Sequence, residues 1–194
     1  MNMKRTLFRW LSPALFVTTA VLMTACASEP SAAPDSRLAI PSNIVATRAP
    51  ELGACEKLSV ADTSKVVFRA FATGVQIYRW SGAAWTFVAP EATLYANADA
   101  TGEIGIHYAG PTWESTSGSK VVAAVIDRCT PNANAIPWLL LGAVSTEGPG
   151  IFDRVTLIQR LNTVGGNAPA SPGSVVGEEA RVPYTAQYFF YRPE

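Results

Sequence analysis

Two alternating runs joined by a glycine-containing turn limit the possible folds of this chain more than any other feature. In residues 75–80, Val75 and Ile77 fall on one face of an extended strand, while Tyr78 and Trp80 fall on the other. A Ser-Gly-Ala turn and the run Ala-Trp-Thr-Phe-Val follow directly. Two such runs separated by about three residues that include a glycine predict a β-hairpin.

Further short runs rich in β-branched, aromatic and other apolar residues continue along the chain, separated by turn-forming residues. They cover residues 65–71, 92–96, 103–108, 121–127, 138–144, 152–161 and 184–191. In the run 152–161, the alternating set that contains Val155, Leu157 and Leu161 is expected to face the core. Residues 163–182 are rich in Gly, Pro and Ser, which predicts a long surface loop.

The number and spacing of these runs predict the fold class. About eight short strands with frequent turns and almost no helical periodicity favour a single all-β domain, a sandwich or barrel of mainly antiparallel strands. One short helix is expected, in the Ala-rich stretch before Cys55 and the segment near Ala61. Circular dichroism dominated by helix would contradict this prediction.

The N-terminus has the pattern of an export signal. Lys4, Arg5 and Arg9 precede a mostly apolar run over residues 11–25, and small residues lead up to Cys26. The segment resembles a bacterial lipobox, in which the thiol of the new N-terminal cysteine is acylated. We therefore expect a lipid anchor on Cys26 and a location in the bacterial cell envelope.

Two alternatives for this segment stay open. Cleavage at Ala25 or nearby without acylation would release an exported protein that has no anchor. An uncleaved transmembrane helix is the other alternative, but the apolar run has about 15 residues where a spanning helix needs roughly 20. The residue after the cysteine is Ala27 rather than aspartate. This choice resembles that of lipoproteins sorted to the outer membrane.

Composition divides the chain into a signal peptide over residues 1–25, a flexible tether over 26–48 and one folded domain over 49–194. The tether is rich in Ala, Ser and Pro and has too little apolar surface to fold. Without the three basic residues of the signal peptide, 12 basic residues face 15 acidic ones, a formal charge of −3. This balance offers no basic patch for a phosphate backbone, so we expect no nucleic-acid partner.

The cysteines agree with an oxidising compartment. If Cys26 carries lipid, Cys55 and Cys129 remain, and an even remainder in an exported protein favours a disulfide between them. Two separate buried thiols are the alternative.

Motifs for established chemistries are scarce. His107 is the one histidine of the sequence, and no Cys-x-x-Cys or His-x-x-x-His spacing, nucleotide fingerprint or nucleophile elbow occurs, so no metal or cofactor is expected. A hydrolase would have to use His107 with Glu114, or with an unmarked serine among residues 115–119. Glu103 and Glu114 form a nonspecific candidate pair for glycoside hydrolysis. The other interpretation is that His107 is a hydrogen-bonded structural histidine.

Aromatic residues are the stronger indication of function. Tyr78 and Trp80 alternate away from the aliphatic face of their strand, and Trp113 lies in a Gly-Pro-Thr-Trp-Glu segment that is interpreted as a rigid loop. Aromatic rings held on a loop or an open sheet face can bind a sugar or another flat ligand. The candidate ligand-binding residues, proposed together with the polar Gln159, are Tyr78, Trp80, Tyr108, Trp113 and Gln159. Burial of these rings in the core is the alternative, and a third possibility is a partner-binding module with a large exposed apolar patch.

Five motifs in fixed order resemble one known family. They are residues 74–80 (GVQIYRW), 107–114 (HYAGPTWE), 118–121 (GSKV), 136–141 (IPWLLL) and 158–169 (IQRLNTVGGNAP). Together they resemble the domain of unknown function 3455 family, which comprises secreted or anchored proteins of bacteria and fungi, over about residues 50–192. The polar residues kept inside these motifs, including His107, Glu114 and Gln159, are either hydrogen-bonding staples or parts of a site.

The resemblance implies no activity that can be transferred. Some fungal members carry the label malate dehydrogenase, but this chain has no dinucleotide-binding βαβ unit and no glycine fingerprint. Family members tend to have a cysteine in the loop after the Gly-Gly-x-Ala-Pro segment, and this chain has none there. A binding or structural lipoprotein is therefore the principal hypothesis, with a hydrolase as the alternative.

Overall fold

The structure, a computed structural model, describes residues 48–194. The predicted signal peptide, Cys26 and all but the last residue of the predicted tether lie outside the described residues. In chain order the elements are η2 (Gly53–Leu58), β1 (Ser64–Trp80), β2 (Trp85–Tyr95), β3 (Glu103–Tyr108), β4 (Thr112–Ser115), β5 (Lys120–Cys129), β6 (Trp138–Glu147), β7 (Leu157–Gly165) and β8 (Glu179–Pro193). No helix among residues 48–194 is long and apolar enough to cross a membrane.

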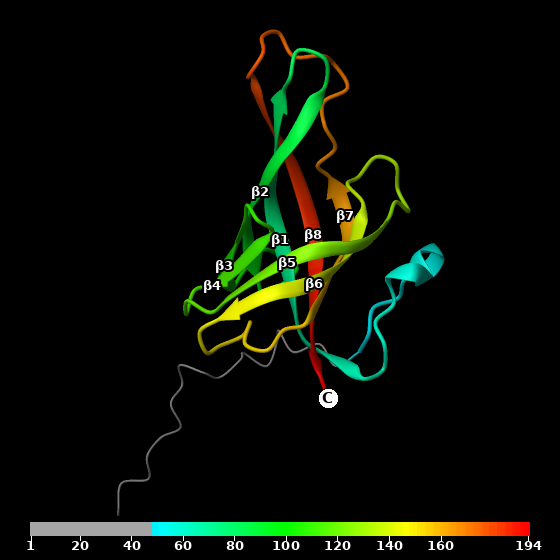
Figure 1. The fold of residues 1–194 in the computed structure, drawn as a ribbon, viewed down its shortest axis with the longest axis vertical. Helices are drawn as coiled ribbons and strands as arrows, with labels where there is room; N and C mark the ends of the chain where they lie inside the picture. Colours follow the sequence, from blue (N-terminus) through cyan, green and yellow to red (C-terminus); the bar gives the residue numbers. More distant parts are fainter. Residues whose placement is uncertain (1–47) are drawn as a thin grey trace, which may run out of the picture. The chain divides into compact units, whose positions relative to one another are not determined.

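The eight strands form one antiparallel sheet that closes on itself (Figure 1). Each strand pairs with the next along the chain, and β1 also pairs with β8 over nearly its whole length, from Ser64↔Pro193 to Arg79↔Glu179. The predicted all-β class is confirmed, and of the two predicted architectures the structure has a closed ring, which is not evenly barrel-shaped. The predicted hairpin is confirmed as well, with Trp80 opposite Trp85.

β1 and β2 are longer than the sequence pattern predicted, because each joins two predicted runs. β1 continues through Gly74, where a Cβ atom would lie 2.1 Å from the backbone oxygen of Glu91. Only a glycine therefore permits the close approach of the two strands at this point. β2 continues through Pro90, which is tolerated because the pairing of β2 with β3 begins only at Ala92.

Two hydrophobic clusters stabilise the sheet, one inside the ring and one outside it. Phe68, Ile158 and Phe190 belong to the interior cluster. Cys55, Leu58, Val66, Leu140, Leu161, Phe189 and Tyr191 form the outer cluster beneath η2. The run Tyr188-Phe189-Phe190-Tyr191 of β8 is consequently buried on both faces.

The outer cluster corrects the predicted orientation of residues 152–161. Leu161 is buried as expected, but Ile158, predicted to point away from the core, is fully buried inside the ring. Phe152, from the same predicted outward set, is also fully buried, and it precedes β7 in a turn. A strand covered on both faces has no single core-facing set, so alternation alone could not predict its orientation.

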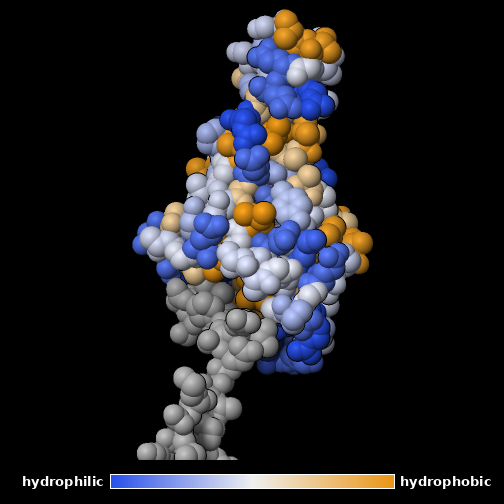
Figure 2. Space-filling view, turned by 90° about the vertical axis from the view of Figure 1, so that its left-hand side faces the viewer, coloured by the Kyte–Doolittle hydropathy of each residue, from blue (hydrophilic) through white to orange (hydrophobic). Residues whose placement is uncertain are grey.

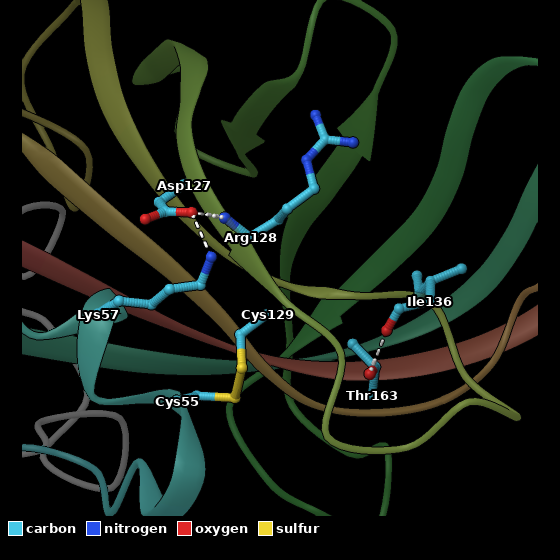
Figure 3. The surroundings of a disulfide bond; sticks show 7 residues. All are labelled: Cys55, Lys57, Asp127, Arg128, Cys129, Ile136 and Thr163. Carbon is cyan, nitrogen blue, oxygen red and sulfur yellow. Dashed lines mark hydrogen bonds and ion pairs between the residues drawn. A yellow bond between two sulfur atoms is a disulfide. The ribbon is translucent and has the colours of Figure 1, made fainter.

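A disulfide joins Cys55 of η2 to Cys129 at the end of β5, as the sequence predicted. An ion pair between Lys57 Nζ and Asp127 Oδ1, 2.8 Å apart, lies beside it (Figure 3). These contacts hold η2 over the outer cluster, where Cys55 and Leu58 are both fully buried.

The loop predicted over residues 163–182 is shorter than expected. β7 continues to Gly165 and β8 begins at Glu179, so the connection covers residues 166–178. It runs beside the β1–β2 hairpin, with Trp85 Nε1 donating to the Ser171 carbonyl at 2.8 Å. Figure 2 shows hydrophobic residues at the top of the view, where Figure 1 places this loop and the hairpin tip. Val175 and Val176 of the loop are exposed.

Candidate functional site

The candidate site is a pocket beside the two shortest strands of the ring, β3 and β4. β3 and β4 have only 6 and 4 residues, so they do not cover the full length of their neighbours. Pairing stops at Ala92↔His107 on one side and at Thr112↔Val122 on the other, while β2 and β5 continue past these points. The gap between β2 and β5 leads into a pocket of about 430 Å³.

All eight strands contribute side chains to this pocket, and two turns complete its wall. The lining residues are Gln76, Tyr78, Phe87, Val88, Pro90, His107, Gly110, Pro111, Trp113, Val125, Arg128, Ile136, Pro137, Leu139, Leu141, Arg160 and Tyr188. Phe87, Val88 and Val125 are exposed, whereas Gln76, His107, Trp113 and Tyr188 are buried. The pocket therefore reaches from solvent into the interior of the ring.

An aromatic cluster forms the pocket's inner wall. His107 and Trp113 lie opposite each other on β3 and β4, with their rings stacked at 4.3 Å between centroids and 12° between planes. Tyr188 of β8 meets both rings edge-on, at 5.2 Å from His107 and 5.3 Å from Trp113. The cluster presents flat apolar surface, and both aromatic arrangements are favourable geometries.

His107 is a neutral side chain with a fixed tautomer. Its Nδ1 lies 2.8 Å from the Thr112 carbonyl oxygen, which can only accept, so Nδ1 carries the proton and Nε2 is left as an acceptor. Burial lowers the pKa of His107 to about 3, and the Arg160 charge also lowers it, against the opposing effect of the Thr112 hydrogen bond. A base this weak is poorly matched to proton abstraction near neutral pH.

Several buried polar atoms around the pocket have no hydrogen-bond partner within residues 48–194. They are Gln76 Nε2, Trp113 Nε1, Tyr184 OH and Tyr188 OH. The two tyrosine hydroxyls lie near each other, Gln76 lies near Tyr184 and Arg160 lies near Tyr188, but none of these contacts has good hydrogen-bond geometry. Burial raises the pKa of both, so both are neutral phenols that retain a proton to donate.

Tyr78 is the exception, because its hydroxyl donates to the Gly166 carbonyl at 2.6 Å. Gly166 has a φ of +82°, and a Cβ atom there would lie 2.9 Å from Cβ of Tyr184 and 3.1 Å from Cγ of Gln76. A glycine is therefore needed to bring the β7–β8 loop against the pocket wall.

Arg160 of β7 supplies positive charge to the pocket. Its Nε and Nη2 donate to the Pro137 carbonyl at 3.2 and 2.8 Å, which fixes the half-buried guanidinium. The same charge acts to lower the pKa values of Tyr78, His107 and Tyr188, although burial dominates each shift. No aspartate or glutamate occurs among the lining residues.

The structure places the candidate ligand-binding residues at different sites. Tyr78 and Trp113 line the pocket together with His107. Trp80 instead packs against Trp85, with 5.4 Å between ring centroids, beside residues 168–172. Tyr108 lies in a shallow depression outside the pocket, where its hydroxyl donates to Glu114 Oε2 at 2.7 Å.

Gln159 lies beside the outer cluster and does not line the pocket. Its Nε2 donates to the Leu58 carbonyl at 2.6 Å and its Oε1 accepts from Tyr191 OH at 2.5 Å. These bonds connect η2 to β7 and β8. Gln159 is therefore placed as a hydrogen-bonding staple.

Trp113 occupies a strand and not the loop that its sequence context suggested. It lies in β4 with 1 % of its surface exposed, and its ring packs in the interior cluster. The Gly-Pro pair before it forms the β3–β4 turn instead, so only the first part of the motif is a loop.

The groups considered for hydrolysis do not converge. Glu114 bonds to Tyr108 outside the pocket, and neither it nor Glu103 lines the pocket. Ser115 Oγ bonds to the Ser117 and Ser119 hydroxyls, both at 2.9 Å, and not to His107. Among residues 48–194, no group of three or more His, Cys, Asp or Glu side chains has the arrangement of a metal site.

Sequence reasoning missed Gln76, Arg160 and Tyr188 as pocket residues. Gln76 and Arg160 lie inside two of the five family-like motifs as polar side chains, Gln76 between Val75 and Ile77 and Arg160 beside Leu161. That pattern could have identified them. Nothing in the aromatic run of β8 distinguishes Tyr188, which faces the pocket, from Tyr191, which lies in the outer cluster.

Comparison with known families identifies the chain. The family described as Protein of unknown function (DUF3455) matches residues 60–192, more than half of the chain, so the chain belongs to this family. Comparisons with curated proteins and with solved structures gave no match. The family description names no activity, and the match begins after η2 and Cys55.

Proposed function

We propose that this domain is a small-molecule-binding module whose pocket holds a flat, mainly apolar ring. The observation that carries the proposal is the pocket of about 430 Å³ lined by the stacked His107–Trp113 pair and Tyr188. This volume falls in the range of small-ligand sites, roughly 300–1,000 Å³. At about 30 Å³ for each water molecule, it corresponds to roughly 14 waters.

The buried unpaired atoms support binding rather than a purely structural role for this cluster. A buried polar group without a partner costs about 1–3 kcal/mol, so such groups are rare in folded proteins. Gln76, Trp113 and Tyr188 each carry such an atom and each line the pocket. A ligand or water that accepts hydrogen bonds would offset part of this cost.

Binding is favoured over hydrolysis by the same geometry. A hydrolytic histidine needs a nucleophile or a carboxylate within hydrogen-bond reach and a pKa near the working pH. His107 instead bonds to a backbone carbonyl, and its pKa is lowered to about 3.

The test is a titration of the full chain with free indole, a neutral flat ring. Binding is monitored through the NMR signal of the side-chain N–H of Trp113. We expect a saturable shift of this signal in the unsubstituted protein. Val125→Trp places a large side chain at the exposed rim of the pocket and should weaken binding at least tenfold. Val144→Trp, at an exposed strand position that does not line the pocket, should bind indole unchanged.

Three results would contradict the proposal. The first is the absence of saturable binding by the unsubstituted protein, and the second is equal binding by both tryptophan variants. The third is saturable binding of methyl β-glucoside without any binding of indole, which would replace the apolar ring by a sugar.

The module is further proposed to act at the bacterial cell envelope, held by lipid on Cys26 and favouring the outer membrane. The support is the sequence of residues 1–27 alone. Mass spectrometry of the mature N-terminal peptide, after expression in a bacterium that processes lipoproteins, should find an acylated Cys26. An unmodified N-terminus at or near residue 26, or an uncleaved chain, would contradict the anchor.

A further inference from the structure

Most basic residues among residues 48–194 form an ion pair with a carboxylate, but the two arginines of the pocket do not. Of the 11 lysines and arginines among residues 48–194, seven pair with a carboxylate. The four that do not are Arg69, Arg128, Arg160 and Arg192. Arg69 lies over the Phe71 ring and Arg192 donates to the backbone carbonyls of Gly150 and Ile151, and neither arginine lines the pocket. The other two line the pocket.

Arg128 is the freer of these two side chains. Its backbone N–H donates to Asp127 Oδ1 at 2.7 Å, but its guanidinium forms no ion pair within residues 48–194. Asp127 is already paired with Lys57. Figure 3 shows the Arg128 side chain extending away from Asp127 and from the disulfide.

Arg160 approaches the pocket from β7, with Pro137 holding one side of its guanidinium. A carbonyl carries only a partial charge, so this contact orients the arginine without neutralising it. The pocket thus holds two positive charges and no carboxylate among its lining residues.

The neutral polar groups of the pocket wall add further hydrogen-bond donors. Trp113 Nε1 has a proton to donate and no partner within residues 48–194. Gln76 Nε2 and Tyr188 OH also have protons to donate, and their neighbours, Tyr184 for Gln76 and Tyr184 and Arg160 for Tyr188, are not in good hydrogen-bond geometry. His107 Nε2 is the acceptor among these groups. A pocket rich in donors and in positive charge is complementary to a ligand that accepts hydrogen bonds and carries negative charge.

We propose that the ligand is a flat ring compound bearing one oxyanion, a carboxylate or a phosphate, which Arg128 and Arg160 recognise while the aromatic wall contacts the ring. This inference rests on the proposed function, because it names the ligand class of the same pocket. The planar guanidinium presents paired N–H donors that match both oxyanions.

Calorimetric titrations of the full chain with a matched set of probes test the inference. Indole-3-acetate carries the anion, whereas indole-3-acetamide has the same ring and nearly the same shape without charge. We expect the acetate to bind at least tenfold more tightly than the amide. Phenyl phosphate distinguishes the two oxyanions, because tighter binding than phenol by the same factor identifies a phosphate as an accepted group.

Charge-removing variants locate the effect. Arg128→Gln and Arg160→Gln should each weaken acetate binding about tenfold and thereby lower the preference for acetate over amide. Arg69→Gln removes an equally unpaired charge outside the pocket and should change neither. Because Arg160 also holds Pro137, Arg160→Lys serves as a second variant that keeps the charge, and it should retain most of the preference for acetate over amide.

The outcomes separate this inference from the proposed function. Equal binding of acetate and amide, with indole still bound, overturns the oxyanion and keeps the pocket. Equal losses in Arg69→Gln and Arg128→Gln also overturn it, since they would indicate only the general charge of the protein. Failure of every probe, indole included, overturns the proposed function itself.

Discussion

Removal of the disulfide is expected to cost this domain a large part of its stability. Cys55 and Cys129 are separated by 74 residues, so the bond closes a long loop in the unfolded chain. In the chain-entropy model a loop of this length stabilises the native state by about 4.5 kcal/mol at 25 °C. Native domains have only about 5–15 kcal/mol in total, so the double variant Cys55→Ala/Cys129→Ala should be marginally stable.

Urea unfolding followed by tryptophan fluorescence measures this effect. With a urea dependence of about 2 kcal/mol per molar, a loss of 4.5 kcal/mol lowers the midpoint by roughly 2 M. Hydrogen exchange adds a local readout, because the amides around the fully buried Leu58 should lose protection first if η2 detaches. Alanine avoids placing a hydroxyl group at the buried Cys55 position.

Lys57→Ala is the matched control, because it removes the exposed ion pair beside the disulfide and leaves the bond intact. We expect its midpoint to be almost unchanged, as exposed pairs contribute little. The reasoning would be refuted by a double variant that loses less than about 1 kcal/mol. A midpoint shift equal to that of Lys57→Ala would refute it as well.

Three further predictions concern the ring itself. Trp113→Ala should destabilise the domain by about 3–5 kcal/mol in chemical denaturation, because the side chain is fully packed in the interior cluster, and a change below about 1 kcal/mol would mean that it is not part of the core. The pKa of His107 in the folded protein is lowered to about 3, below the value of about 6.5 in the unfolded chain. As the pH falls, the unfolded chain therefore binds a proton before the folded protein does. The free energy of unfolding should consequently decrease as the pH drops from about 6.5 to 3. That slope is up to about 1.4 kcal/mol per pH unit, and it should diminish in His107→Gln, with an unchanged slope indicating other groups. Gly74→Ala should cost about 1–3 kcal/mol or more in thermal unfolding, since its Cβ would meet the Glu91 carbonyl at 2.1 Å, and a neutral result would show that β1 and β2 can separate there.

Local patterns predicted the fold class because each antiparallel strand is encoded in its own residues. The run 75–80 alternates and a glycine turn follows it, and these features specify the β1–β2 hairpin without distant contacts. The predicted orientation of residues was wrong in β7, which is covered on both faces. Ile158 and Leu161 point to opposite faces of β7, and both are buried because η2 covers the outer face.

The site was less predictable than the fold, because its members come from all eight strands. Tyr78, His107 and Trp113 were selected for their chemistry, and the structure places them in one pocket wall. Trp80 and Gln159 were selected in the same way and lie elsewhere. Residue type indicates what a side chain can do, whereas its neighbours across the ring depend on strand register.

The sequence by itself determined the strands, the hairpin, the membership of a family and the compatibility of Cys55 with Cys129, because these depend on local periodicity, turn residues and cysteine count. Only the tertiary structure decided that the sheet closes through β1 and β8 and that short β3 and β4 leave an opening. It alone also placed Arg128 and Arg160 at one pocket without a carboxylate. These features arise from pairings between residues as many as 129 positions apart, such as Ser64↔Pro193, and no local pattern in the chain encodes such a distance.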